Sequence, residues 1–224
     1  MDVTDDESVR KSREIVDTVL REKISVRISE MSDSLSDLSC PNQQRWSGGN
    51  VFYDDFLTVD DYKDVWEVNM CGVIRVTQTF RDLIKKSRGR IVICSSACIL
   101  FTSPSHGPYA SSKFAVHAYT AVLRHELQPY GVDVIEIVPG SFDTGMTILD
   151  NVQKMLDTIW YRASQKLRDE YGHNYKEKAT KFIKELGPKV WAKDFTCVTN
   201  SYYEAIVARR PKLLYQIGWD LLLM

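Results

Sequence analysis

The 224-residue sequence lacks the features that mark several large classes of protein. Its 29 basic and 30 acidic residues leave a net charge of −1, so no overall positive field exists to hold nucleic acid or an anionic membrane. No apolar run approaches the roughly 18 residues of a membrane-spanning helix. The acidic, polar start MDVTDDESVRKSRE is unlike a secretory signal. We therefore expect an intracellular protein that has no membrane anchor and does not bind nucleic acid.

Cysteines are few and odd in number: Cys40, Cys71, Cys94, Cys98 and Cys197. An odd set without regular spacing argues against a disulfide framework. Cys94 and Cys98 are four residues apart, but no cluster of histidines or cysteines lies near them to complete a zinc site. We therefore expect free thiols, a reducing compartment and no bound metal.

The composition, 44% hydrophobic and 26% charged, is typical of a globular protein, and the length fits one domain. Periodic apolar residues predict helices, and short runs of β-branched residues predict buried strands. Strands and helices alternate in the second half of the chain, which predicts a parallel α/β sheet. The predicted helices cover 5–22, about 58–86, 108–129, 150–186 with a joint near Gly172, and 192–209; the predicted strands cover 91–94, 132–138 and 212–216.

Local signals support two of these helix starts and predict one irregular stretch. The segments Thr4–Glu7 and Thr58–Asp61 have the spacing of capping boxes. Residues 23–50 show no sustained period and hold seven serines, with Pro41 and Gly48-Gly49 as breakers. We expect an irregular loop there, which is unusually long for a compact domain.

Two serines, a tyrosine and a lysine follow the predicted strand 91–94. Ser95 and Ser96 come directly after it, Tyr109 lies thirteen residues beyond Ser96, and Lys113 lies four beyond Tyr109. Residues i and i+4 of a helix lie one turn apart on one face, so the Lys113 ammonium can lie beneath the Tyr109 hydroxyl. A nearby positive charge lowers the pKa of a phenol from about 10. Such a tyrosine can exchange a proton with an alcohol or a carbonyl.

This arrangement predicts hydride transfer between a carbonyl and a nicotinamide, with Ser96 bonding the same substrate oxygen. The Tyr-x-x-x-Lys spacing by itself is a weak signal, because it arises often by chance and better fits a packed tyrosine beside a solvated lysine. Asn69 lies on the apolar stripe of the predicted helix 58–86 and, by itself, fits a buried amide satisfied by backbone groups. Gly72, three residues later, would let another backbone come close.

Four segments carry a resemblance to a known family: LTVDDYKDVWEVNMCGVIRVTQTF, GRIVICSSA, PSHGPYASSKFAVHAYTAVLRHELQPYGVDVIEIVPGSFDTGM and YQIGWD. The chain resembles the short-chain dehydrogenases/reductases, most closely their retinol and hydroxysteroid dehydrogenase branch. The resemblance covers nearly all of residues 50–220. It implies a Rossmann-like, doubly wound parallel sheet in one domain over 1–224, with substrate-loop helices over 145–190.

The resemblance also implies roles for individual residues. Tyr109 is expected to be the catalytic acid/base, Lys113 to lower its pKa and hold the nicotinamide ribose, and Ser96 to orient the substrate oxygen. Asn69 is expected to hold a water in a proton relay toward Lys113. The implied cofactor is NAD or NADP, contacted by Asp2 and Val3 at the adenine and by Pro139, Gly140 and Thr144 at the nicotinamide.

One element of the family's fold is absent from the sequence. The family seats the cofactor's pyrophosphate on a glycine-rich turn before a helix, and none of the eleven glycines belongs to a G-x-x-x-G-x-G pattern. We therefore interpret the chain as N-terminally truncated, with a partial sheet that lacks the family's first strands. Its three remaining strands should lie side by side, and we expect no measurable binding of NAD or NADP.

Two functional hypotheses follow. The first is an oxidoreductase that transfers a hydride between NAD(P) and a lipophilic alcohol or ketone, retinoid- or steroid-like by resemblance. The alternative is an inactive truncated product that keeps the catalytic and dimerisation helices but binds no dinucleotide. In either case the resemblance implies a homodimer or pairing with a full-length relative. Members of this branch are often associated with the endoplasmic reticulum membrane, although this chain shows no anchor.

Overall fold

A parallel sheet of three strands forms the centre of the computed structural model, which describes residues 1–22, 52–143 and 149–218. The strands are β1 (Arg90–Cys94), β2 (Asp133–Pro139) and β3 (Leu214–Ile217), in the order β1-β2-β3. All pairings are parallel, with Val92 opposite Ile135 and Val138 opposite Gln216. The predicted parallel α/β sheet with these strands side by side is therefore confirmed.

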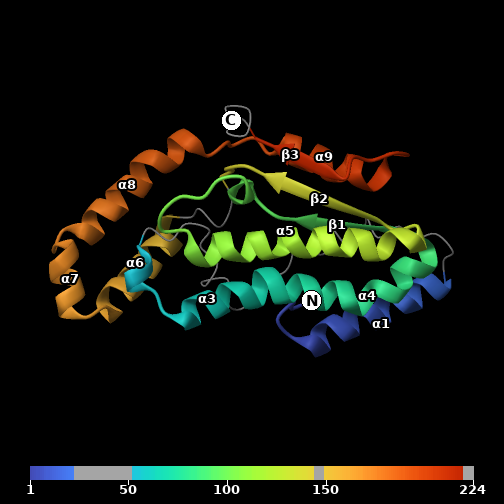
Figure 1. Cartoon of the computed structure of the whole chain (residues 1–224), viewed down its shortest axis with the longest axis horizontal. Coiled ribbons are helices and arrows are strands. Elements are labelled where there is room, and N and C mark those ends of the chain that lie inside the picture. The colour runs from blue at the N-terminus through green and yellow to red at the C-terminus, as the bar shows by residue number, and fades with distance from the viewer. Residues whose placement is uncertain (23–51, 144–148, 219–224) are drawn as a thin grey trace.

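The described part of the chain also forms eight α-helices. They are α1 (Asp6–Glu22), α3 (Val59–Trp66), α4 (Gly72–Ser87), α5 (Gly107–Leu127), α6 (Leu149–Arg162), α7 (Gln165–Tyr171), α8 (Tyr175–Val190) and α9 (Thr196–Val207). Figure 1 shows α4 and α5 along one side of the sheet, α9 on the other, and α6 to α8 arching away from one end. The predicted helices are confirmed, except that the stretch 150–186 also breaks between α6 and α7, where no joint was predicted. The predicted loop 23–50 lies outside the described residues.

The two predicted helix starts have different outcomes. At α3 the capping box is confirmed, because the Asp61 carboxylate accepts hydrogen bonds from the backbone N–H and the hydroxyl of Thr58, both at 2.7 Å. At α1 the predicted cap was wrong: Asp5, not Thr4, accepts from the free N–H groups of the first turn. The Thr4 hydroxyl instead donates a hydrogen bond to the Asp2 carboxylate at 2.7 Å. A carboxylate is also the better partner for the positive end of a helix dipole.

Apolar side chains pack on both faces of the sheet. Toward α4 and α5, buried residues such as Phe80, Leu123 and Val134 form one cluster. Toward α9, Ile137 of β2 packs with Ala205 in another. Because β2 is covered on both faces, its apolar side chains are shielded from water.

A third, separate cluster is made of aromatic rings. It joins the three helices α6, α7 and α8 to the segment that precedes α3. Phe52, Phe56, Trp160, Tyr171 and Tyr175 lie with ring centroids 4.8 to 6.2 Å apart. The joint predicted near Gly172 separates α7 from α8, and its φ of +87° explains the glycine. Helices are thus confirmed in the described part of 145–190, whereas their role as a substrate loop stays a prediction.

Gly72 lies where the N-terminal segment crosses the long helix α3–α4. A Cβ added there would lie 2.9 Å from Val3 Cγ2 and 3.2 Å from Val3 Cβ, both shorter than ordinary contacts. The Arg75 guanidinium holds the segment in place by donating a hydrogen bond to the Val3 carbonyl. The predicted close approach at Gly72 is confirmed.

We expect Gly72→Val to lower the free energy of unfolding by about 1–3 kcal/mol. The larger side chain gains only a few tenths of a kcal/mol in helix propensity, which is less than the cost of overpacking against a held segment. Urea unfolding measures the change, and Val3→Ala added to the variant should restore at least half of the loss. An unchanged midpoint in Gly72→Val would mean that the segment moves aside freely.

Candidate active site

Tyr109, Lys113 and Ser96 come together at the carboxyl end of β1. Tyr109 and Lys113 lie on the first two turns of α5, which begins beside Pro108, and the Lys113 ammonium is 5.7 Å from the centre of the Tyr109 ring. The ammonium also donates to the Cys94 carbonyl at 3.3 Å, so it is anchored to the end of the strand. Ser96, two residues beyond Cys94, lies near enough to the Tyr109 side chain to lower its pKa. The spacing therefore assembles these three groups as predicted.

Burial raises the pKa of Tyr109, and this effect is larger than any other at that group. The Lys113 charge and the nearby Ser96 side chain both lower the pKa of Tyr109. Lys113 therefore acts in the predicted direction, but the net shift in this structure is upward. The reason is that the buried hydroxyl loses the water that would stabilise its ionised form.

Asn69 is held at a distortion in the long helix. Residues Glu67–Cys71 form a π-helical turn between α3 and α4, and Asn69 is buried within it. Its amide nitrogen donates to the Ser112 hydroxyl at 3.0 Å, and Ser112 in turn donates to the Tyr109 carbonyl at 2.7 Å. Such π-turns occur often at functional sites. The amide thus connects to α5 through a serine, whereas its role toward Lys113 stays a prediction.

The sequence analysis assigned no role in this site to three residues of the region. Ser112, three residues after Tyr109, is fully buried and connects α5 to Asn69. Cys98 follows Ser96 and donates its backbone N–H to the serine hydroxyl at 3.4 Å, and burial raises the pKa of the thiol. The Ser95 hydroxyl is buried with no hydrogen-bond partner among the described residues. Only proximity to the Ser-Ser and Tyr-x-x-x-Lys motifs could have indicated them.

The residues predicted to hold a cofactor lie at two separate places. Pro139 ends β2 and Gly140 follows it, with the Gly140 N–H donating to the Ile217 carbonyl at 2.6 Å. Parallel strands put these residues at the same sheet edge as Ser96. Thr144 lies outside the described residues. Asp2 accepts two hydrogen bonds from Thr4, and Val3 packs on Gly72, so this pair lies near the helix of Asn69.

The described residues form neither a cluster of metal ligands nor a membrane-spanning helix. No group of three or more His, Cys, Asp or Glu side chains gathers there in a way that would hold a metal ion. Among the same residues, no helix combines the length and the hydrophobicity needed to cross a bilayer.

Comparison with known proteins shows the family in which Tyr109, Lys113 and Ser96 are to be placed. Residues 48–154 match the family model of short chain dehydrogenases. The chain belongs to the short-chain dehydrogenase/reductase family. It is 32% identical, over its whole length and 55% of the relative, to a 3beta-hydroxysteroid dehydrogenase of Caenorhabditis elegans. It is 34% identical to human retinol dehydrogenase 16, over 75% of this chain and 52% of the relative. The resemblance seen in the sequence is thus confirmed.

Solved structures support the same fold. A short-chain dehydrogenase/reductase from Burkholderia phymatum, in complex with NAD, superposes with a TM-score of 0.61 at 21% identity, covering 96% of this chain and 68% of that one. ElxO with NADP bound superposes with a TM-score of 0.60 at 17% identity, covering 100% and 77%. These likenesses show a Rossmann-like fold. The chain spans about half the length of the curated relatives it matches.

Proposed function

We propose that this short-chain dehydrogenase/reductase chain is an oxidoreductase that transfers a hydride between NAD(P) and a lipophilic alcohol or ketone. The observation that carries the proposal is the convergence of Tyr109, Ser96 and Lys113 at one strand end. The names of the relatives, retinol and hydroxysteroid dehydrogenases, support a lipophilic substrate. Leu100 and Phe101, exposed just beyond Ser96, offer apolar surface for such a substrate.

Each residue of the site has a definite task in this proposal. Ser96 donates a hydrogen bond to the substrate oxygen and holds it near Tyr109. The Tyr109 hydroxyl takes up a proton from the alcohol during oxidation or returns it to the carbonyl during reduction. Lys113 stabilises the phenolate through its charge, while the bond to Cys94 keeps that charge in place. Asn69 and Ser112 hold the backbone of α5 behind Tyr109.

The fit of the cofactor differs between its two ends. The nicotinamide end would be held by Lys113, Pro139, Gly140 and Thr144. The buried Ser95 hydroxyl has no hydrogen-bond partner among the described residues, so it is free to bond a polar group of the cofactor. NAD(P) supplies the hydride acceptor or donor when bound. At the adenine end, Asp2 and Val3 would make the contacts. No glycine-rich turn for the pyrophosphate is found in the sequence.

A second candidate is a non-catalytic chain that pairs with itself or with a longer relative through α4 and α5. A direct titration separates the two. A ligand that binds only the folded state at a hundredfold excess over its Kd stabilises it by about 2.7 kcal/mol. Thermal shift and calorimetry with millimolar NAD and NADP would therefore detect cofactor binding. Binding together with turnover of retinol or a hydroxysteroid supports the oxidoreductase; a flat titration supports the second candidate.

We expect Lys113→Met to weaken cofactor binding and to slow the proton step together. The variant removes the charge that lowers the pKa of Tyr109 and the donor proposed for the ribose. Calorimetry gives the cofactor Kd, and the absorbance of reduced nicotinamide gives turnover. Lys86→Met, an exposed lysine on α4, is the matched control. Normal cofactor affinity in Lys113→Met would show that this lysine does not touch the cofactor.

A further inference from the structure

Successive turns of the long helix α3–α4 contact the first turns of α5, where Tyr109 lies. Tyr62, Trp66 and Asn69 are spaced four and three residues apart, so they lie along one side of that helix. Figure 1 shows α3 running beside the first half of α5. Asn69 reaches α5 through Ser112. The contacts made by Tyr62 and Trp66 lie one on each side of Tyr109.

Tyr62 lies directly against the first residue of α5. A Cβ added to Gly107 would lie 2.3 Å from the Tyr62 hydroxyl oxygen, which is far closer than two such atoms can approach. The hydroxyl is itself held, because it donates a hydrogen bond to the Asp54 carboxylate. This bond raises the pKa of Tyr62 to about 12, so the hydroxyl keeps its proton at neutral pH. The start of α5 is therefore in contact with a fixed side chain two residues before Tyr109.

Trp66 holds the same turn of α5 from its other end. Its indole Nε1–H donates to the Ser111 hydroxyl at 2.9 Å, and the Ser111 hydroxyl donates to the Gly107 carbonyl at 2.7 Å. The Trp66 ring also packs edge-on against Tyr62, with centroids 5.9 Å apart. Because Trp66 is 42% exposed, water can replace its hydrogen bond, which should contribute little to the stability of the whole fold.

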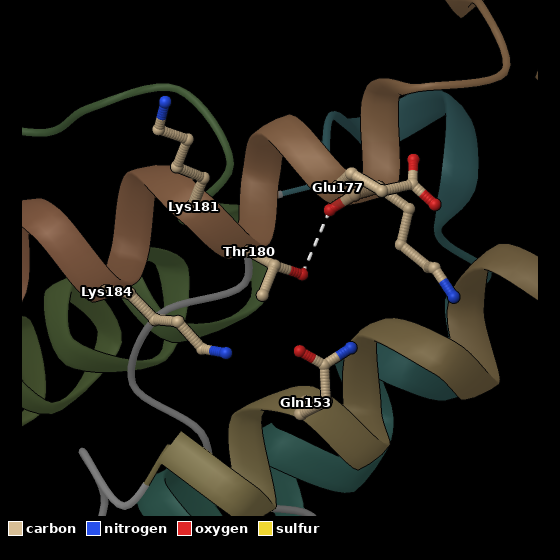
Figure 2. Close-up of a pocket in the computed structure, with 6 residues that line it drawn as sticks. Gln153, Glu177, Thr180, Lys181 and Lys184 are labelled. Atoms are coloured by element: carbon tan, nitrogen blue, oxygen red, sulfur yellow. Dashed lines mark hydrogen bonds between the residues drawn. The ribbon is translucent and has the colours of Figure 1, made fainter.

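The bond from α3 distinguishes Ser111 from other hydroxyls that bond within their own helix. Thr180 of α8 donates to the Lys176 carbonyl at 3.0 Å, beside the hollow between α6 and α8 (Figure 2). Ser201 of α9 donates to the carbonyl one turn before it at 2.8 Å. In the described part of the chain, neither of these two hydroxyls accepts a hydrogen bond from another helix. The indole of Trp66 thus makes Ser111 a connection between two helices.

We propose that Trp66 and Ser111 are positioning residues for Tyr109. Their hydrogen bond fixes the turn that carries the Tyr109 hydroxyl against α3, and so sets the distance of that hydroxyl from the Lys113 ammonium and from the substrate oxygen. Both residues act through the backbone of α5. A misplacement of about 1 Å can cost about a hundredfold in rate. The effect on rate rests on the proposed hydride transfer, whereas the position of Tyr109 can be measured without it.

The first measurement follows Tyr109 itself, by fluorine NMR of the whole chain labelled with 3-fluorotyrosine, and needs no turnover. Tyr109→Phe identifies the signal. Trp66→Phe keeps a ring beside Tyr62 but removes the indole N–H, and should shift the Tyr109 signal by more than its linewidth. Ser111→Ala should do the same, while Ser111→Thr, which retains a hydroxyl, should restore the wild-type position. Ser201→Ala is the matched control and should leave the signal unchanged.

The second measurement separates rate from binding, with retinol or a hydroxysteroid as the substrate. In Trp66→Phe and in Ser111→Ala, kcat should fall about tenfold or more, with KM and the cofactor Kd within about twofold of the wild type. The double variant should be no slower than the slower single variant, because both changes remove the same bond. Similar melting temperatures would show that the loss is not one of folding.

Two results would overturn the proposal. One is a Tyr109 signal that stays in place in both Trp66→Phe and Ser111→Ala, whatever the activity of the wild type. The other is a shifted signal with unchanged kcat in a wild type that turns over. A wild type without turnover would instead count against the proposed function, and the fluorine signal alone would then decide whether Trp66 and Ser111 hold Tyr109.

Discussion

Under the proposed oxidoreductase function, Tyr109→Phe is expected to lower the rate of hydride transfer by about 10²–10⁴-fold, the contribution of one positioned acid/base. The substitution removes only the hydroxyl, so the ring still packs at the start of α5 and Lys113 keeps its bond to Cys94. Cofactor affinity should therefore stay within about twofold of the wild type. Turnover is measured with retinol or a hydroxysteroid, and cofactor Kd by calorimetry.

Tyr203→Phe provides a control for this experiment, because Tyr203 is an exposed tyrosine on α9 away from the strand ends. It should leave both turnover and cofactor affinity unchanged. Activity of Tyr109→Phe within tenfold of the wild type would remove Tyr109 from the acid/base role. A joint loss of turnover and cofactor affinity would instead indicate that the hydroxyl contributes to binding the cofactor.

His117→Leu is expected to lower the free energy of unfolding by about 2–4 kcal/mol. The Glu136 carboxylate of β2 is only 2% exposed, and both of its oxygens lie 2.9 Å from His117 Nδ1. Removing one partner of a buried pair leaves an uncompensated polar group and typically costs 3–5 kcal/mol. We place the loss lower because the His117 side chain is 44% exposed, so water can partly replace it.

Urea unfolding of four proteins tests this pair. Adding Glu136→Leu to His117→Leu should recover most of the loss, because the buried carboxylate is then gone together with its partner. His125→Leu, an exposed histidine near the end of the same helix, should change stability by less than about 0.5 kcal/mol. If His117→Leu is as mild as His125→Leu, the pair does not hold α5 to the sheet.

The aromatic cluster, the Glu136–His117 pair and the π-turn at Asn69 share one property: each depends on contacts between residues far apart in the chain. No local pattern distinguishes Glu136 from a strand residue that faces water. Likewise, the sequence places Asn69 on an apolar stripe but does not identify Ser112 as its partner. Local spacing therefore predicts where such residues lie, and only packing decides what they bond.

The sequence by itself determined the order of helices and strands, the family, and the proximity of Tyr109 to Lys113. Periodicity and the i, i+4 geometry of a helix are local properties, so they can be read from the sequence before the fold is known. The tertiary structure decided the cap of α1, where Asp2 engages Thr4 and leaves Asp5 to cap. It also decided the net direction of the Tyr109 pKa, because burial depends on everything packed around the hydroxyl, and that effect exceeds the nearby charge.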